Sequence, residues 1–171
     1  VEFIGQAIFL IAAETEDKAR EAEKMIEVDY EPLEPVLDLE AAIAKDNMLT
    51  KPAKIETGDT EKALRSSEHM LEGSFESGPQ EHFYLETQSC ICVPGEGSEI
   101  NVYSSTQHPS ETQTIVAGVL GVTSNLVNVE VKRLGGAFGG KETQANHFAA
   151  WAALLANATS KAVLIHLSRD D

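Results

Sequence analysis

The chain has 171 residues, a formal net charge of −15 at pH 7 and an apolar fraction of 42%. This length allows one domain, or one domain with part of another, and the apolar fraction is ordinary for a chain that buries a core. Its acidic residues are spread along the sequence, and no cluster of Lys and Arg stands ready to neutralise phosphates. We therefore expect neither nucleic acid nor a membrane surface as a partner, and no stretch approaches the length of a membrane span.

The chain opens with an apolar run at residues 5–13, which predicts a buried strand. The run has no basic leader or cleavage region, so it does not resemble a secretory signal. Thr15 is a candidate N-cap for the helix that follows, and residues 26–30 predict a second strand. The apolar face expected for this helix consists of Ala19, Ala22, Met25 and Ile26.

Asp38 can cap a short helix that ends near Ala44. Residues 45–60 have no clear period and predict a linker, with a domain boundary near residue 50. A region rich in strands follows, with strands expected at 69–76, 83–93 and 98–105 and a turn at residues 94–97 (PGEG) between the last two.

Residues 109–120 give the clearest helical pattern in the sequence. Pro109 suits the first helical position and Gly121 suits the C-cap. The expected buried face consists of Ile115, Val116, Val119 and Leu120. A strand at 126–132, a helix at about 142–157 and a strand at 161–168 complete the chain. The stripe expected on the second helix is Ala145, Phe148, Ala149, Ala152 and Leu155. The sequence thus predicts an α+β fold of mixed sheets and packed helices.

Two cysteines occur as Cys90 and Cys92, separated by one residue. On a strand their side chains point to the same face, and residues this close in an extended strand are difficult to bridge. No Cys or His lies near them at the spacing of a zinc site. We therefore expect buried structural thiols, which fits a reducing cytoplasm.

Residues 135–142 (GGAFGGKE) place four glycines around Phe138, between a predicted strand and a predicted helix. Such a loop brings backbone N–H groups close to a ligand, and the following helix adds unpaired N–H groups, so the run predicts a site for an anion, a phosphate or a metal-bound oxygen. It matches the phosphate-loop pattern of nucleotide hydrolases except that Glu142 stands where Ser or Thr must hold magnesium. This mismatch disfavours a nucleotide, and a tight packing turn is the plain alternative.

Two polar side chains lie at predicted strand-to-helix junctions. Gln107 follows one strand and Glu142 follows the glycine loop, and the two junctions share a rim if their strands are parallel. Gln107 can donate an amide N–H to a ligand oxygen, or it can satisfy backbone groups at a helix start. Glu142 can bind substrate or handle a proton, or it can be a first-turn acid that complements the helix dipole.

Three motifs in order resemble the xanthine dehydrogenase and aldehyde oxidase family of molybdenum hydroxylases. They are residues 80–86 (QEHFYLE), residues 105–107 (STQ), and residues 131–133 (VKR) with 135–142. The resemblance covers essentially the whole chain. It implies the C-terminal part of an α/β hammerhead domain at 1–36, a linker at 37–52 and the N-terminal part of the first molybdopterin-binding domain at 53–171.

The resemblance also implies site residues. In this family the Gln of the second motif hydrogen-bonds the apical oxo ligand of molybdenum, which assigns that role to Gln107. The glycine loop lies against the cofactor, and the amide of its Phe faces the same oxo ligand, so Phe138 is the second expected neighbour of the metal. The expected cofactor-binding set is Gln107, Gly136, Phe138 and Gly139. Glu142 occupies the position that contacts purine in xanthine-oxidising members and is commonly apolar in aldehyde oxidases, so Gln107 and Glu142 are the expected catalytic residues.

One position departs from the pattern of animal members, which carry a Lys four residues after the Gln. Here that position is Glu111, so a role for the Lys is not carried over. The family's proton-abstracting Glu and substrate-binding Arg lie beyond residue 171. We therefore expect this chain to be inactive when isolated from the remainder of the molybdenum subunit.

The function implied is oxidation of hypoxanthine or xanthine to urate, with oxygen from water, at a molybdopterin-bound molybdenum centre. Electrons would pass to 2Fe–2S clusters and FAD and then to NAD, in other domains or subunits of a cytoplasmic enzyme that we expect to be a homodimer. One alternative is an aldehyde or other N-heterocycle hydroxylase of the same family. Another is a non-catalytic structural or binding fragment.

Overall fold

The computed structural model describes residues 1–170 and divides into two compact units. One unit contains residues 1–26 and the segment from Gln80 onward, and the other contains Glu27–Pro79. The first unit holds a four-stranded mixed sheet in the order β3-β2-β1-β4. Its strands are β1 (Ser89–Pro94), β2 (Ile100–Ser104), β3 (Val127–Glu130) and β4 (Val163–His166). The predicted α+β class, with a mixed sheet and packed helices, is confirmed.

The central pair of strands is an antiparallel hairpin in which Cys92 of β1 lies opposite Val102 of β2. The predicted turn closes it, since the Gly95 N–H donates to the Glu99 carbonyl at 2.8 Å. β3 pairs in parallel with β2, and β4 pairs antiparallel with β1. The strand expected at 83–93 begins only at Ser89, because residues 83–88 form no strand in the described chain. Tyr84 and Glu86 pack against the glycine loop instead.

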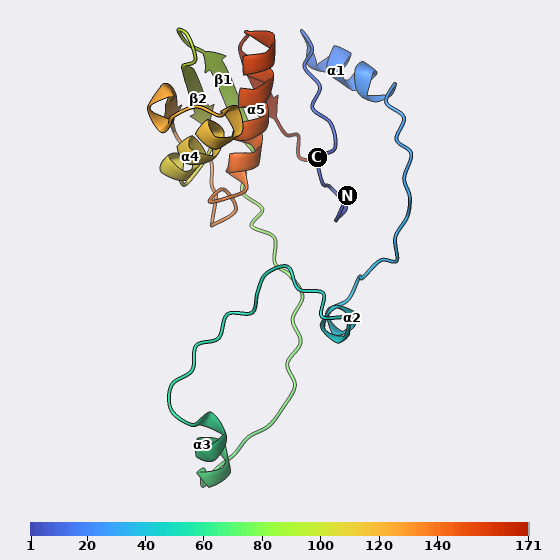
Figure 1. The fold of residues 1–171 in the computed structure, drawn as a ribbon, viewed down its shortest axis with the longest axis vertical. Coiled ribbons are helices and arrows are strands. Elements are labelled where there is room, and N and C mark those ends of the chain that lie inside the picture. Colours follow the sequence, from blue (N-terminus) through green and yellow to red (C-terminus); the bar gives the residue numbers. More distant parts are fainter. Residues whose placement is uncertain (171) are drawn as a thin grey trace. The chain divides into compact units, whose positions relative to one another are not determined.

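Two helices cover one face of the sheet (Figure 1). α4 (Pro109–Leu120) connects β2 to β3, and α5 (Ala145–Thr159) connects β3 to β4. The predicted bounds of α4 are confirmed, with Pro109 at its start and Gly121 as a C-cap at φ 69°. Its expected buried face is wrong in part: Ile115 and Val119 are 39% and 44% exposed. The buried residues of α4 are Thr112, Val116 and Ala117. Only one of the twelve residues of α4 is charged. The sequence therefore does not distinguish clearly between a polar face and an apolar face, and it does not predict which side of the helix is buried.

The core forms where α5 meets β1 and β2. Cys90 and Cys92 are 1% and 0% exposed and lie against alanines of α5. Their sulfur atoms are 3.8 Å apart and unbridged, which confirms the expected structural thiols. A hydrogen bond with Cys90 and burial raise the pKa of the Cys92 thiol. The expected stripe on α5 is confirmed at its alanines, and Phe148 packs against the edge of the core.

The predicted strands at 5–13 and 26–30 are wrong, since neither segment is a strand in the described chain. Phe9 is 50% exposed, and no strand of residues 1–170 pairs with the apolar run. A strand is stable only when its backbone groups are paired with those of another strand. An apolar run alone is therefore insufficient to predict a strand. The helix between these segments is confirmed as α1 (Glu16–Glu23), where the Thr15 side chain accepts from the Lys18 N–H.

The second unit contains two short helices, α2 (Leu39–Ala44) and α3 (Thr60–Ser66). The α2 prediction is confirmed, with the Asp38 carboxylate accepting from the Ala41 N–H at 2.7 Å. α3 was missed, and the strand expected at 69–76 is absent from the described residues. The missed signal was Asp59, which caps α3 by accepting from the Lys62 N–H at 2.9 Å.

Candidate cofactor site

The ends of β2 and β3 bring two predicted site segments together. Because these strands are parallel, the residues that follow them leave the same edge of the sheet. The Gln107 N–H donates to the Lys141 carbonyl at 2.9 Å, and the Lys141 N–H donates to Gln107 Oε1 at 3.3 Å. The expectation that the two junctions share a rim is therefore confirmed.

These contacts set the orientation of the Gln107 amide. Its Oε1 accepts the Lys141 N–H, so its Nε2 is the group left to donate. The side chain is exposed, and no residue of the described chain accepts a hydrogen bond from Nε2. Thr106 supports this arrangement by donating from Oγ1 to the Lys141 carbonyl at 3.3 Å. The amide NH₂ of Gln107 is thus a free donor at the rim.

The glycine loop packs tightly against residues 82–86. A Cβ built at Gly135 would lie 2.5 Å from Glu86 Cβ, and one at Gly140 would lie 2.5 Å from Tyr84 Cε1. Gly136 and Gly139 have φ values of 96° and 94°, which side-chain-bearing residues rarely adopt. The loop therefore needs glycine both for close approach and for its backbone path.

The outer part of the same loop presents unpaired donors. The N–H groups of residues 136–139 have no hydrogen-bond partner among residues 1–170, whereas the Gly140 N–H is bonded to the Ala137 carbonyl at 2.8 Å. Phe138 has a φ of 52° and is 75% exposed. Successive unpaired N–H groups in a turn can bind an anion. Together with the Gln107 amide NH₂, this donor set fits a cofactor with oxygen ligands or phosphate groups.

Glu142 lies in a turn rather than in a helix. Its side chain is exposed, its N–H donates to the Gly139 carbonyl at 3.3 Å, and α5 begins three residues later at Ala145. The predicted helix start at 142 is therefore wrong, because the end of the glycine loop closes through turns before α5 begins. The alternative interpretation of Glu142 as a first-turn acid is also wrong, since the first turn of α5 has no acid.

An ion pair between the buried Lys141 and the half-buried Glu86 lies beside the loop and was missed by the sequence analysis. The Lys141 side chain is fully buried, and its Nζ lies 2.9 Å from Glu86 Oε2 and 2.8 Å from Ser105 Oγ. The same ammonium lies 4.8 Å from the centroid of the Tyr84 ring. A Lys in a polar, glycine-rich run resembles an exposed residue, and its partners are distant in sequence, so no local pattern identifies it.

The Glu86 carboxylate collects the hydrogen bonds of this cluster. Oε2 accepts from Ser105 Oγ at 2.6 Å, from the Gly135 N–H at 2.9 Å and from Lys141. Burial acts to raise the pKa of Glu86, but the hydrogen bonds from Ser105, Lys141 and Gly135, with the charge of Lys141, outweigh it and lower the pKa to about 2. Glu86 is therefore ionised at neutral pH and ties the loop to β2.

This pKa predicts an acid-dependent loss of stability. Because the folded-state pKa of Glu86 lies below its ordinary value of 4.5, the contribution of Glu86 to stability is complete above pH 4.5 and is lost as the pH falls toward 2. We expect Glu86→Gln to flatten the pH dependence of the urea midpoint across this window, relative to the unmutated protein. Parallel curves for the two proteins would contradict the assignment.

Two further side chains hold residues 82–88 against the loop. Gln88 Nε2 donates to Tyr84 Oη and to the Gly140 carbonyl, each at 3.0 Å. The Arg169 guanidinium donates to the Tyr84 and Leu85 carbonyls at 2.9 and 2.5 Å. Neither residue was singled out from the sequence. Both fix the backbone against which the glycine loop packs.

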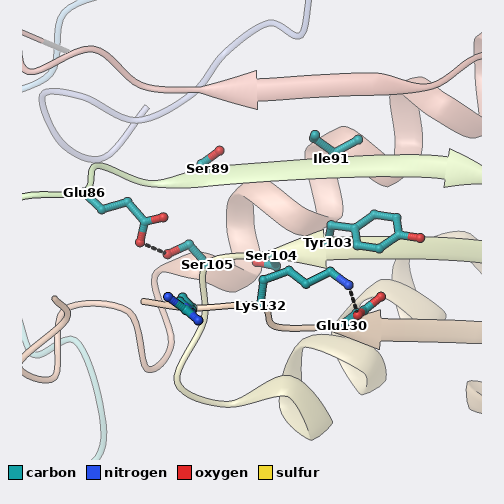
Figure 2. Close-up of a pocket in the computed structure, with 9 residues that line it drawn as sticks. Glu86, Ser89, Ile91, Tyr103, Ser104, Ser105, Glu130 and Lys132 are labelled. Atoms are coloured by element: carbon teal, nitrogen blue, oxygen red, sulfur yellow. Dashed lines mark hydrogen bonds and ion pairs between the residues drawn. The ribbon is translucent and has the colours of Figure 1, made fainter. Parts of the chain in front are cut away.

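A depression of about 150 Å³ lies next to this cluster, on the sheet face opposite α4 and α5 (Figure 2). Figure 2 shows Glu86 turned toward Ser105 at one end and Lys132 toward Glu130 at the other. The depression is lined by Glu86, Ser89, Ile91, Tyr103, Ser104, Ser105, Glu130, Lys132 and Arg133. Gln107, Phe138 and Glu142 do not line it, so the predicted site residues lie at the adjacent rim.

Among residues 1–170 no group of three or more His, Cys, Asp or Glu side chains is arranged to hold a metal ion. Within the same range, no helix has the length and apolar character needed to cross a membrane.

Comparison with known proteins places this site in a family. The sequence model of one protein family, the molybdopterin cofactor-binding domain, matches residues 42–171. The chain therefore belongs to the molybdopterin cofactor-binding domain family. The donor set formed by Gln107 and the glycine loop fits such a cofactor.

Particular relatives agree with the resemblance found in the motifs. The chain is 44% identical over 168 residues to a xanthine dehydrogenase of Dictyostelium discoideum, covering 98% of this chain and 12% of that protein. It is 44% identical over 170 residues to aldehyde oxidase 1 of Oryctolagus cuniculus, covering 98% of this chain and 13% of that protein. The similarity to the xanthine dehydrogenase and aldehyde oxidase family is thus confirmed, and the chain spans about an eighth of the length of these relatives.

Solved structures share the fold. Quinoline 2-oxidoreductase from Pseudomonas putida 86 aligns with a TM-score of 0.74 at 24% identity, over 92% of this chain and 21% of that chain. Aldehyde oxidoreductase from Desulfovibrio gigas aligns with a TM-score of 0.72 at 24% identity, over 91% of this chain and 18% of that chain.

Proposed function

We propose that this chain is the part of a molybdenum hydroxylase that contacts the molybdenum cofactor through Gln107 and the glycine loop. The proposal rests on one observation. The free Gln107 NH₂ and the loop whose residues 136–139 have unpaired N–H groups meet at the same rim, where Gln107 bonds to Lys141. When bound, the molybdenum cofactor supplies the centre that accepts electrons from the substrate. Hydrogen-bond donors that are already held in place stabilise a negative charge without first having to move toward it.

The proposed roles follow from where each group lies. Gln107 donates its amide N–H to the cofactor, and the Phe138 N–H is the second donor. Gly136 and Gly139 shape the loop through their positive φ values and bring its backbone to the cofactor. Glu142 follows the loop directly and is exposed, so its carboxylate is available to orient a substrate.

The proposed substrate class is a purine such as hypoxanthine or xanthine. Overall identity does not favour a purine over an aldehyde, since the chain is 44% identical both to a xanthine dehydrogenase and to an aldehyde oxidase. The preference rests on Glu142, whose carboxylate can accept hydrogen bonds from the ring N–H groups of a purine. An aldehyde or another N-heterocycle is the second candidate.

The remainder of the protein belongs to the same proposal. We propose that residues 1–36 end a hammerhead domain, that 37–52 are a linker, and that 53–171 begin the molybdopterin-binding domain. The complete enzyme would be a cytoplasmic homodimer that passes electrons through 2Fe–2S clusters and FAD to NAD. The isolated chain would be inactive, because it provides only part of the site.

The deciding experiment is the molybdenum content of the full-length parent protein, measured by elemental mass spectrometry after purification from its native source. We expect about one molybdenum atom per protomer. A parent without molybdenum, from a host whose other molybdoenzymes are loaded, would mean that the fold is present without its chemistry. It would favour a structural or binding role for this segment.

In the complete enzyme, Glu142→Ala is expected to lower kcat/KM for xanthine well beyond about tenfold, because a polar substrate contact in a dry pocket is lost. Steady-state kinetics with xanthine and with an aromatic aldehyde would measure the effect. Glu142→Gln is the matched control, since it keeps the shape and one acceptor oxygen and should lose less. An unchanged kcat/KM for xanthine in Glu142→Ala would remove Glu142 from the site.

A further inference from the structure

Lys141 makes polar contacts both through its side chain and through its backbone. Its side chain is fully buried, with the ammonium between Glu86 Oε2 at 2.9 Å and Ser105 Oγ at 2.8 Å. Its backbone makes both polar contacts with Gln107, one through the carbonyl and one through the N–H. The anchor and the group that orients the amide therefore belong to the same residue.

Burying an ammonium is unfavourable unless its partners satisfy it. Here the partners come from two other segments: Glu86 precedes β1, and Ser105 follows β2 directly. Ser105 is also close to Gln107 in the sequence, so the ammonium links the glycine loop to the segment that carries the amide. The aromatic ring of Tyr84 closes a further side at 4.8 Å. These contacts leave the backbone at residue 141 little freedom to move.

We propose that Lys141 is a positioning residue for Gln107. Its buried ammonium fixes the backbone at residue 141. The Lys141 N–H then donates to Gln107 Oε1, and the Gln107 amide NH₂ is left to face the ligand. Without the anchor, the amide of the exposed Gln107 side chain is free to rotate and offer its oxygen instead, which repels an oxygen ligand. The consequence for catalysis rests on the proposed function, whereas the effect on the loop does not.

The first test is hydrogen exchange by mass spectrometry on the full-length parent carrying Lys141→Met. Methionine keeps an unbranched apolar side chain and removes the ammonium. We expect exchange to accelerate by about tenfold or more in peptides covering residues 105–108 and 135–142, because the bonds between Gln107 and Lys141 open more often. This measurement needs neither substrate nor bound cofactor.

The second test is kinetic and uses the cofactor-loaded parent. Lys141→Met is expected to lower kcat by about 10- to 100-fold with a smaller change in KM, since a displaced donor costs rate rather than substrate affinity. Because Lys141 acts through Gln107, the double variant Lys141→Met with Gln107→Ala should be no slower than Gln107→Ala alone. Multiplying effects would mean that Lys141 does not act through Gln107, and would overturn the proposal.

Lys132→Met is the matched control. It also removes a lysine from the segment between β3 and α5, but the Lys132 side chain is 73% exposed and pairs with Glu130. We expect no acceleration of exchange at 105–108 from this variant. The same acceleration in both variants, or none in Lys141→Met, would overturn the proposal.

Ser105→Ala decides the matter if Lys141→Met does not fold. It removes one partner of the ammonium and one hydrogen bond to Glu86, and it leaves the ion pair between Lys141 and Glu86 in place. A smaller acceleration confined to the same peptides supports the proposal, and no acceleration overturns it. A parent that lacks molybdenum contradicts the proposed function, while the exchange experiment still decides whether Lys141 positions Gln107.

Discussion

Replacing Glu86 by alanine is expected to lower the free energy of unfolding of the unit that holds the four-stranded sheet (the sheet unit) by up to about 3–5 kcal/mol, because it leaves the fully buried Lys141 ammonium without its ion-pair partner. This range is an upper bound, since the Glu86 side chain is 35% exposed. Lys141 is fully buried, and after the replacement its ammonium would keep only Ser105 and the Tyr84 ring. The Gly135 N–H would also lose its acceptor. Native-state hydrogen exchange at the β1 and β2 amides of the parent protein would measure the loss.

Glu130→Ala is the control for this prediction. Glu130 also forms an ion pair with a lysine, but the Lys132 and Glu130 side chains are 73% and 42% exposed. Exposed pairs contribute about 0–1 kcal/mol, so this variant should be nearly neutral. Equal losses in the two variants would show that burial of Lys141 does not determine the energetics of the cluster.

The elements that could be predicted from the sequence are those set by local chemistry. Pro109 and Gly121 mark the ends of α4, and Asp38 marks the start of α2, because caps act within a few residues. The hairpin of β1 and β2 follows from the turn rich in glycine between two segments with strand-like sequences. The apolar run at 5–13 shows the limit of this approach, since no strand of the described chain pairs with it.

The candidate site could be predicted in part for the same reason. The meeting of Gln107 with the glycine loop follows from a parallel β2–β3 pair, and the order of motifs suggested the family. The pair of Lys141 and Glu86 joins residues 55 positions apart and depends on how residues 82–86 pack against the loop. Neither residue type, taken locally, indicates such a contact. The glycine run is thus packed against residues 82–86, and the side chains that anchor it lie elsewhere in the chain.

That close packing gives the second large prediction. Gly140→Ala is expected to destabilise the sheet unit by about 1–3 kcal/mol, the range for adding a methyl group to a packed site. The new Cβ would lie 2.5 Å from Tyr84 Cε1 and 3.0 Å from His82 Cγ. The Tyr84 ring is held by the hydrogen bond from Gln88 to its Oη and by the Lys141 ammonium, so moving it disturbs both contacts. In the cofactor-loaded enzyme, the displaced loop should also lower kcat by about 100-fold. Native-state exchange and steady-state kinetics would measure the two effects.

Gly118→Ala separates this steric effect from the general consequences of replacing glycine. Gly118 lies in α4, where an added Cβ has nothing within 4 Å, so alanine should stabilise the helix by about 0.5–1 kcal/mol. Neither Gly118 nor Gly140 has a positive φ, so backbone strain is absent from both variants. The two sites differ in that Gly118 gains helix propensity, whereas Gly140 lies in a turn and gains only the contact with Tyr84 and His82. Changes of opposite sign are therefore expected. A neutral Gly140→Ala would mean that residues 82–86 yield to the loop and do not hold its donors in place.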